Sequence, residues 1–438
     1  MPTPTPRHRP VSRRAFGGLA AGAAATAGLA ACGGGSASSE GPVNLRFTWW
    51  GSDARHQYTQ QIIDAFNEEH PDIHVEGEFT EWSGYWDRLA TNVAANDAPD
   101  IIQMDAIYLR SYADRGALLD LSQLDGLDTS AIDSTALDTG ETGDGLFGLV
   151  SGVVPLGIMT NPALVQAAGQ QMPDDTTWTW GDYEALGAAI SAGTPDGTYG
   201  VANGGIDEAG LQLWVKQLGG AFYDDEGNVT LDPAMVTDWY EYNLGLIESG
   251  AAGPVTLAME RAVAALDQSG IATNTTAMQQ YWATQITALA GASGQPLTLL
   301  RPPTQSPGGE PGVYYKPSMF WSASARTEHP EAVATFLDHL VNSEAVADLM
   351  LTERGIPANT QIREYISPKL SETDRLAIDY TDSLADVVED TPPSAPAGAS
   401  TIEEIVRRYG SEVLFGQQQP AAAARAMVEE LTNSVESA

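Results

Sequence analysis

The feature that most restricts the fold is a regular alternation of apolar strands and amphipathic helices, which starts at Val43. Val43–Trp50 is predicted to be a buried strand and Ile101–Met104 a short apolar strand, and Ile73–Phe79 alternates apolar and polar residues. Between them, residues 58–66 and 86–93 place apolar side chains at helical spacing. This order predicts an α/β fold in which helices cover both faces of parallel-rich sheets. Ligands bind beyond the carboxyl ends of the strands in such sheets.

The alternation continues toward the end of the 438-residue chain, which is long enough for two domains. His329 and Pro330 open a helix with one apolar face. After a proline-rich segment, Ser400 and Glu403 predict a capping box for a helix that runs toward Leu414. We therefore expect two α/β domains.

Residues 1–31 have the features of an export signal. Four arginines precede or border Gly17–Ala31, a weakly apolar run of about 15 residues that is too short to span a bilayer. Ser12–Phe16 resembles the twin-arginine export signal, and Leu29–Cys32 resembles the lipobox of bacterial lipoproteins. We expect Cys32 to be diacylated and 32–42 to form a flexible tether, because two acyl chains anchor stably where one does not. The protein would then be held at the extracellular face of the cytoplasmic membrane by lipid alone.

The charge and cysteine content exclude several classes of partner. The chain has 58 Asp+Glu against 21 Lys+Arg, and four of those arginines lie in the leader. A surface this acidic repels nucleic acid and anionic lipid head groups. It fits either a soluble, salt-adapted surface or a cationic ligand. Cys32 is the single cysteine, so the folded body contains no intramolecular disulfide.

Enzyme and metal motifs are missing from the chain. The six histidines form no H-E-x-x-H pattern and have no cysteine partners, so we predict neither a metal site nor a cofactor. Gly143–Gly148 matches G-x-G-x-x-G, but no strand precedes it and acidic residues surround it. We interpret it as a glycine-rich turn. Paired carboxylates leave one catalytic alternative open, a surface glycoside hydrolase.

From Asn44 to the C-terminus the chain resembles bacterial extracellular solute-binding protein family 1, the maltose-binding-protein-like sugar-binding lipoproteins of ABC transporters. Five segments that carry this resemblance are Ala94–Ile102, Gly116–Leu121, Phe320–Ser324, His329–Leu337 and Gly355–Ala358. Each is short, and their order along the chain is what makes the resemblance specific.

The resemblance implies two lobes joined by three crossovers, near Val150–Leu156, Leu299–Thr304 and Ile366–Glu372. The first lobe would comprise 43–152 with 303–368, and the second 153–302 with 369–438. Closure of the lobes on a ligand would create the shape that a permease recognises.

The implied function is non-catalytic capture of a mono- or oligosaccharide by a monomer, followed by delivery to the transmembrane subunits of an ABC permease. The same fold could instead bind a polyol phosphate, a polyamine or a peptide. A sugar site needs aromatic rings for the flat faces of the sugar and carboxylates or amides for its hydroxyls.

Five candidate ligand-binding residues lie in the expected first lobe. Trp50 ends the first strand, Asp53 follows it, and Glu81 and Trp82 follow the second strand. Asp105 follows the third strand. The alternative for Asp53 and Asp105 is that each caps the helix that begins beside it.

Five further candidates come from the second lobe and a crossover. Glu208 precedes an apolar helix, and the resemblance places a sugar-stacking ring at Tyr281 or Trp282 without deciding between them. Phe320 and Trp321 adjoin the second crossover, where we expect one ring to face the cleft. The remaining central aromatic residues are predicted to be structural: Trp178, Trp180, Trp214, Trp239 and Tyr242.

Overall fold

The computed structural model of the 438-residue chain describes residues 41–51, 53–80, 82–143, 145–262, 264–393, 395–396 and 398–437. The expected signal peptide, the lipid-attachment site Cys32 and Glu81 lie outside these residues, and so does the side chain of Asp53. The chain divides into two units, 1–41 and 42–438, and the helices and strands of the described residues belong to the second unit.

The predicted strand Val43–Trp50 (β1) is present and is the centre of a parallel group. It pairs with β2 (Ile73–Thr80) along its whole length and with β3 (Ile101–Met104) over a shorter stretch. The helices of this part are α1 (Asp53–Glu69), α2 (Trp82–Ala94), α3 (Ala106–Asp114) and α4 (Ser134–Asp138). The carboxyl ends of β1 and β3 bring Trp50 and Asp105 to the same edge of the sheet.

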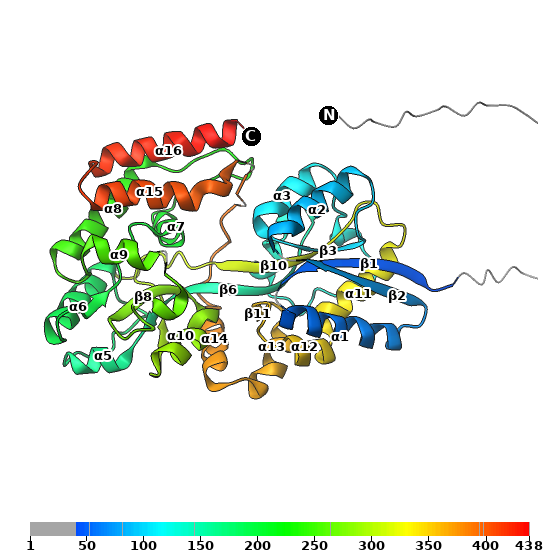
Figure 1. Ribbon diagram of the computed structural model, residues 1–438, viewed down its shortest axis with the longest axis horizontal. Coiled ribbons are helices and arrows are strands. Elements are labelled where there is room, and N and C mark those ends of the chain that lie inside the picture. Colours follow the sequence, from blue (N-terminus) through cyan, green and yellow to red (C-terminus); the bar gives the residue numbers. More distant parts are fainter. Residues whose placement is uncertain are drawn as a thin grey trace, which may run out of the picture. The chain divides into compact units, whose positions relative to one another are not determined.

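Two long strands connect the parallel group to the rest of the sheet. The first half of β6 (Leu149–Thr160) pairs antiparallel with β10 (Tyr315–Ala323), and its second half pairs with β8 (Thr276–Trp282) and β9 (Thr298–Leu300). The strand order is β2-β1-β3-β10-β6-β8-β7, where β7 is Tyr199–Val201, and β11 (Ile356–Pro357) and β9 also pair with β6. Figure 1 shows β6 and β10 running from one group of helices into the other.

The central and C-terminal parts of the chain supply the helices around β8. In chain order the central elements are α5 (Pro162–Ala167), α6 (Trp180–Gly193), β7 (Tyr199–Val201), α7 (Glu208–Gln217), α8 (Pro233–Glu248), α9 (Val255–Ala262) and α10 (Ile286–Ser293). Two late helices, α15 (Ile402–Leu414) and α16 (Pro420–Glu436), return to pack beside α8 (Figure 1).

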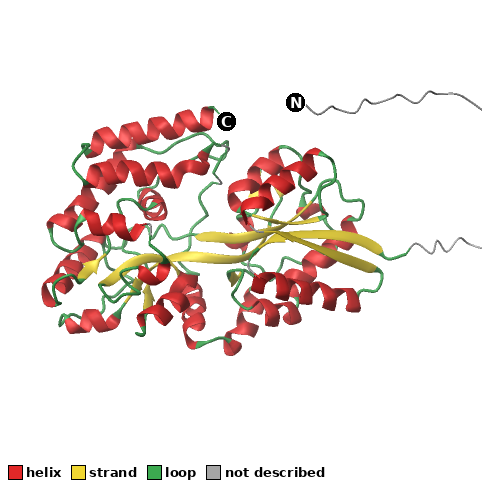
Figure 2. Ribbon diagram, viewed as in Figure 1, coloured by secondary structure: helices red, strands yellow, loops and turns green. Residues whose placement is uncertain are grey.

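A later stretch of the chain, residues 330–383, returns to β6, with which its strand β11 pairs. It contains α11 (Pro330–Asn342), α12 (Glu344–Met350), β11 (Ile356–Pro357), α13 (Thr360–Ile366) and α14 (Glu372–Ser383). The Tyr380 hydroxyl of α14 donates a hydrogen bond to the Leu156 carbonyl at 2.8 Å, so α14 is fixed to the middle of β6. Helices enclose strands throughout, and the α/β class predicted from the sequence is confirmed (Figure 2).

The buried apolar residues form two clusters. The first core contains Phe47, Trp49, Trp321 and Phe336, and α14 contributes to it. The second core gathers around buried tryptophans and tyrosines: Trp178, Trp180, Trp214, Trp239 and Tyr240. The tryptophans predicted to be structural are therefore buried. The domain boundaries drawn from the sequence stay a prediction, because the first core also takes in Ile286 and Leu289 from the expected second lobe.

Two local predictions have clear outcomes. The glycine-rich segment near Gly143 lies in a short hairpin in which Glu141 pairs with Leu146, so it is a turn as expected. The capping box at Ser400 is wrong, because α15 is preceded by a 3₁₀ turn and its N-cap is Thr401, whose side chain makes no capping bond. Among the described residues, no helix has the length and apolar character needed to cross a bilayer.

Candidate ligand-binding site

A cavity of about 490 Å³ opens at the carboxyl ends of β7 and β8. The residues that follow β7 and the last residues of β8 line it, together with parts of α8, α9 and α15. Its wall combines amide groups, aromatic rings and three charged groups, Asp207, Arg261 and Arg407. Carboxyl ends of parallel strands are where α/β sheets commonly bind ligands, and β7 and β8 pair in parallel.

Several polar atoms of the cavity wall are buried without a hydrogen-bond partner in the described chain. They are Oε1 of Gln279, Nε2 of Gln280 and Nε1 of Trp239. Such an atom costs about 1–3 kcal/mol when it stays unpaired. A polyhydroxylated ligand in the cavity would supply both donors and acceptors to these groups. The wall is therefore better suited to a polar ligand than to an apolar one.

Aromatic rings form one side of the same cavity. Tyr242 stacks on Trp214 with ring centroids 5.0 Å apart, and Trp180 meets Tyr242 edge-on at 5.5 Å. Trp239 lies 5.4 Å from Trp214. The sequence correctly predicts packing roles for these residues, but it does not reveal that Trp180, Trp239 and Tyr242 also border a cavity.

Tyr281 and Trp282 both line the cavity, at the end of β8. Backbone pairing places Tyr281 opposite Gly157 and Trp282 opposite Leu156 on β6. Both side chains are partly exposed. Nζ of Lys316 lies 4.9 Å from the centroid of the Trp282 ring. Since both rings reach the cavity wall, the choice between them stays open and calls for separate variants.

Lys316 is a site residue that sequence reasoning missed. It is the exposed residue of β10 between buried Tyr315 and Pro317, and no carboxylate of the described chain lies within ion-pair distance of it. Its charge nevertheless acts on Asp105 from one side and on Asp207 and Glu208 from the other. Two predicted candidates that are distant in sequence, Asp105 and Glu208, are thus both affected by the charge of one lysine. The chain has only three lysines, and Lys316 lies near a predicted crossover between the lobes. That position is the one signal in the sequence that could have indicated it.

Asp207 and Glu208 begin α7 in a partly buried position. Asp207 is the N-cap, and one carboxylate oxygen accepts the Ala209 N–H at 3.2 Å. Burial raises the pKa of Asp207 to about 6 and that of Glu208 to about 7, and repulsion from Glu403 adds to both shifts while Lys316 opposes them. Near neutral pH this pair is partly protonated, so it can both donate and accept hydrogen bonds with a hydroxyl group.

The raised pKa of Glu208 predicts a pH dependence of stability. Its pKa is about 7 in the folded protein against an ordinary 4.5, so folding takes up a proton between those values. The stabilisation is complete below pH 4.5 and is lost as the pH rises through 7. We expect the free energy of unfolding of the wild type, relative to Glu208→Gln, to fall by about 1–2 kcal/mol from pH 5 to 8 once solvent screening is allowed for.

Urea unfolding at several pH values measures this difference. Glu248→Gln removes one exposed carboxylate from the same acidic protein and is the matched control. A wild-type-minus-Glu208→Gln difference that stays constant over this pH range would contradict the assignment.

The candidates of the parallel group have separate outcomes. Trp50 is 7% exposed and packs edge-on against Trp82, with ring centroids 5.1 Å apart. Its role is therefore to hold the Trp82 ring in place, because it has little surface left for a ligand. Trp82 is 43% exposed and can present a face to solvent. Asp105 caps α3 by accepting the Ile107 N–H at 3.0 Å, as the structural alternative predicts. Burial raises the pKa of Asp105, whereas the Ile107 N–H and Lys316 act in the opposite direction.

The expectation that Phe320 or Trp321 faces the cleft is wrong. Both side chains are 0% exposed and belong to the first core. The reason is that β10 is flanked by β3 and β6 at this point, and Trp321 meets Phe47 edge-on at 5.6 Å. Adjacent aromatic residues in a strand covered on both faces are both buried.

Arg261 and Arg407 are two further residues of the cavity wall that the sequence did not indicate. The Arg261 guanidinium donates to the hydroxyls of Thr275 and Thr276, which fixes its position. Neither arginine has a carboxylate within ion-pair distance in the described chain. The cavity wall is thus richer in cations than the strongly acidic chain around it.

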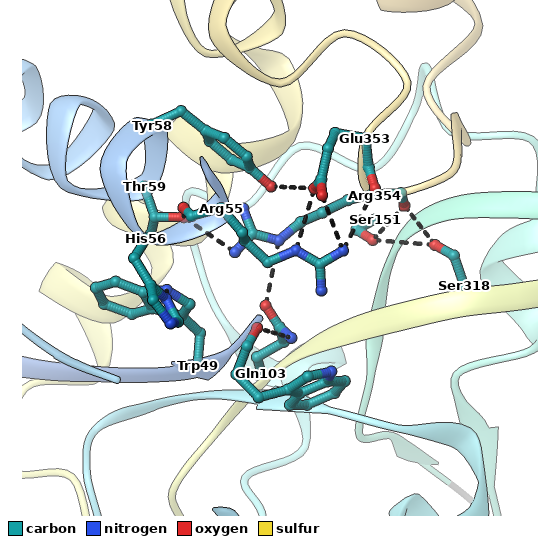
Figure 3. Close-up of polar contacts among 11 residues, drawn as sticks. Trp49, Arg55, His56, Tyr58, Thr59, Gln103, Ser151, Ser318, Glu353 and Arg354 are labelled. Atoms are coloured by element: carbon teal, nitrogen blue, oxygen red, sulfur yellow. Dashed lines mark hydrogen bonds and ion pairs between the residues drawn. The ribbon is translucent and has the colours of Figure 1, made fainter. Parts of the chain in front are cut away.

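A buried arginine joins the parallel group to the two long strands (Figure 3). Arg354 is 1% exposed, and its guanidinium donates to Gln103 Oε1 at 3.2 Å and to Thr59 Oγ1 at 3.0 Å. Its backbone carbonyl accepts hydrogen bonds from Ser151 of β6 and Ser318 of β10. These bonds tie the loop after α12 to both β6 and β10.

Comparisons with known proteins agree with this arrangement. Residues 51–347 match the family model described as bacterial extracellular solute-binding protein. An extracellular solute-binding protein family 1 structure from Alicyclobacillus acidocaldarius has a TM-score of 0.79 and 24% identity, covering 91% of this chain and 100% of that one. A periplasmic oligogalacturonide binding protein from Yersinia enterocolitica has a TM-score of 0.78 and 21% identity, covering 90% and 99%. These likenesses support a periplasmic-binding-protein-like fold.

A curated relative extends the comparison in sequence. A protein of Streptomyces antibioticus described as an uncharacterized lipoprotein in the oleD 5′ region is 30% identical over 178 residues. The match covers 40% of this chain and 38% of the relative, so it spans well under half of either protein.

Proposed function

Since the chain belongs to the bacterial extracellular solute-binding protein family, we propose that it captures an oligosaccharide outside the cell and delivers it to the permease of an ABC importer. The observation that carries this proposal is the cavity beside β8. It has aromatic rings, which can pack against the flat faces of a sugar. It also has buried amide and indole groups that lack a hydrogen-bond partner in the described chain and could bond to sugar hydroxyls. We assign the protein no catalytic role.

The position of Lys316 supports a site shared between the two cores. Asp105 lies on the side of the first core and Glu208 on the side of the second, and both feel this one cation. A ligand that bonds to groups on both sides favours the arrangement in which they are close, because it binds that arrangement more tightly. A permease could then distinguish the loaded protein from the free one.

Anchoring through Cys32 is part of the proposal. The support is the leader pattern and the relative that is described as a lipoprotein. Two acyl chains on one cysteine would hold the body at the membrane while the tether leaves it free to reach its permease.

Arg261 and Arg407 favour an acidic saccharide as a specific form of the same function. A carboxylate-bearing sugar could pair with a guanidinium that has no acidic partner among the described residues. The relative from Yersinia enterocolitica that binds oligogalacturonide makes uronides a natural probe. Neutral gluco- and galacto-oligosaccharides of matched length are the comparison.

Ligand should raise the melting temperature of the body by mass action on the folded state. At a concentration one hundred times Kd, the gain is about 2.7 kcal/mol, which corresponds to about 3 °C for a chain of this size. Differential scanning fluorimetry against neutral and uronic oligosaccharides measures it. Calorimetry on each positive sugar then gives Kd. If no carbohydrate in a broad panel moves the melting temperature, while a peptide or polyamine does, the sugar assignment fails.

A further inference from the structure

Two histidines and a glutamate meet where α1 ends against α11. Glu69 is the last residue of α1, His70 follows it, and His339 lies on α11. One carboxylate oxygen and one nitrogen from each imidazole all lie within 4.8 Å of one another. No local sequence pattern indicates this group, because its members come from helices that are far apart along the chain.

Phe66 holds both imidazoles in place. It is fully buried, His70 stacks on it with centroids 4.3 Å apart, and His339 meets its edge at 5.2 Å. The two histidine rings are nearly perpendicular, with centroids 6.3 Å apart. Rings fixed by packing lose little freedom on binding, which is the requirement for a pre-organised ligand set.

The three side chains converge without bonding to each other. In the described chain, none of the three makes a side-chain hydrogen bond or an ion pair. Their spacing exceeds that of a direct hydrogen bond, whereas ligand atoms around a tetrahedral metal ion with bonds of about 2.1 Å lie about 3.4 Å apart. Glu69 is exposed, so binding would require its carboxylate to move closer to the two imidazoles.

The surroundings favour a cation at this point. The carbonyl end of α1 carries the negative end of the helix dipole, and the charges of Glu69 and Asp338 act on His339. A bound cation would therefore meet favourable charges as well as three converging ligand atoms.

We propose that Glu69, His70 and His339 bind one divalent transition-metal ion, of which Zn²⁺ is the representative. Two imidazoles and a carboxylate, with water completing the shell, form a common ligand set for this ion, whereas Mg²⁺ prefers oxygen ligands alone. The bound ion links α1 to α11 on the first core. The site shares no residue with the cavity beside β8, so the metal proposal can be tested independently of the proposed transport function.

The test uses untagged protein, because a polyhistidine tag would bind the same metal. After treatment with EDTA and dialysis, ZnCl₂ is titrated into the protein at pH 7.5 and binding is followed by competition with a chromogenic chelator. We expect one equivalent to bind, with a rise in melting temperature that MgCl₂ does not produce. His70→Ala and His339→Gln should each weaken binding by about tenfold or more.

His74→Ala is the matched control, because His74 is an exposed histidine of β2 outside the group. It should retain the wild-type affinity. Circular dichroism of each metal-free variant verifies that it is folded, and the chelator competition reports affinity even where stability has changed. Wild-type affinity in the folded His70→Ala and His339→Gln variants, or the same loss in His74→Ala, would overturn the proposal.

Discussion

We expect the replacement of Trp282 with alanine to lower the affinity for the proposed saccharide by about thirtyfold, equivalent to about 2 kcal/mol. Trp282 ends β8, lines the cavity and lies beneath Lys316 at 4.9 Å. A sugar face stacked on the indole would lose both its apolar contact and the ordered position of the lysine. Isothermal titration with the best sugar of the panel measures the loss.

Two variants make the Trp282 result specific. Phe415→Ala removes a ring that is 47% exposed at the end of α15 and does not line the cavity, and it should bind as the wild type does. Tyr281→Ala tests the neighbouring ring. If Trp282→Ala binds within twofold of the wild type while Tyr281→Ala loses affinity, Tyr281 is the stacking residue. If neither changes Kd, β8 does not form the sugar site.

Replacing Arg354 with alanine lowers the free energy of unfolding by about 3–5 kcal/mol. The guanidinium lies 5.0 Å from the ring centroid of Tyr58 and 4.8 Å from that of Trp321, so truncation leaves a cavity between two rings. It also removes the donors to Gln103 and Thr59. Burial lowers the pKa of Arg354 to about 10, so the cost of desolvating its charge offsets part of what these contacts contribute.

Urea unfolding monitored by tryptophan fluorescence measures this loss. Arg354→Lys keeps the charge but cannot span both acceptors, so we expect it to recover less than half of the stability. Arg326→Ala removes an exposed arginine as the control and should change the free energy of unfolding by less than about 0.5 kcal/mol. A wild-type midpoint for Arg354→Ala would mean that the buried charge contributes nothing net.

Local pattern was enough to predict several elements. β1 and β3 have the predicted bounds, because large apolar side chains recur along both segments and pack into the first core. The candidate site was harder, because its geometry depends on contacts between distant segments. Asp105 and Glu208 could be predicted because each stands where a strand ends or a helix begins. Lys316, whose charge acts on both carboxylates, could not, because the pattern of its strand indicates only that it is exposed.

The error at Phe320 and Trp321 has the same origin. Sequence places these rings near a crossover, but whether a crossover strand is open or covered depends on its neighbours in the sheet. Arg354 likewise gives no signal of its own, since Gln103, Thr59 and Trp321 come from three separate segments.

The antiparallel ribbon of β6 and β10 has a mechanical consequence. Backbone pairing joins the two strands from Leu149 to Pro155, so the ribbon resists stretching and sliding along its length. Its register shifts at Ser318, whose hydroxyl bonds to Gly152 and Arg354 on the neighbouring chain segments. Such an irregularity interrupts the ladder of backbone hydrogen bonds locally, so the strand bends more easily there than elsewhere. We therefore expect any movement between the two cores to bend the ribbon at this point and not to slide one strand along the other.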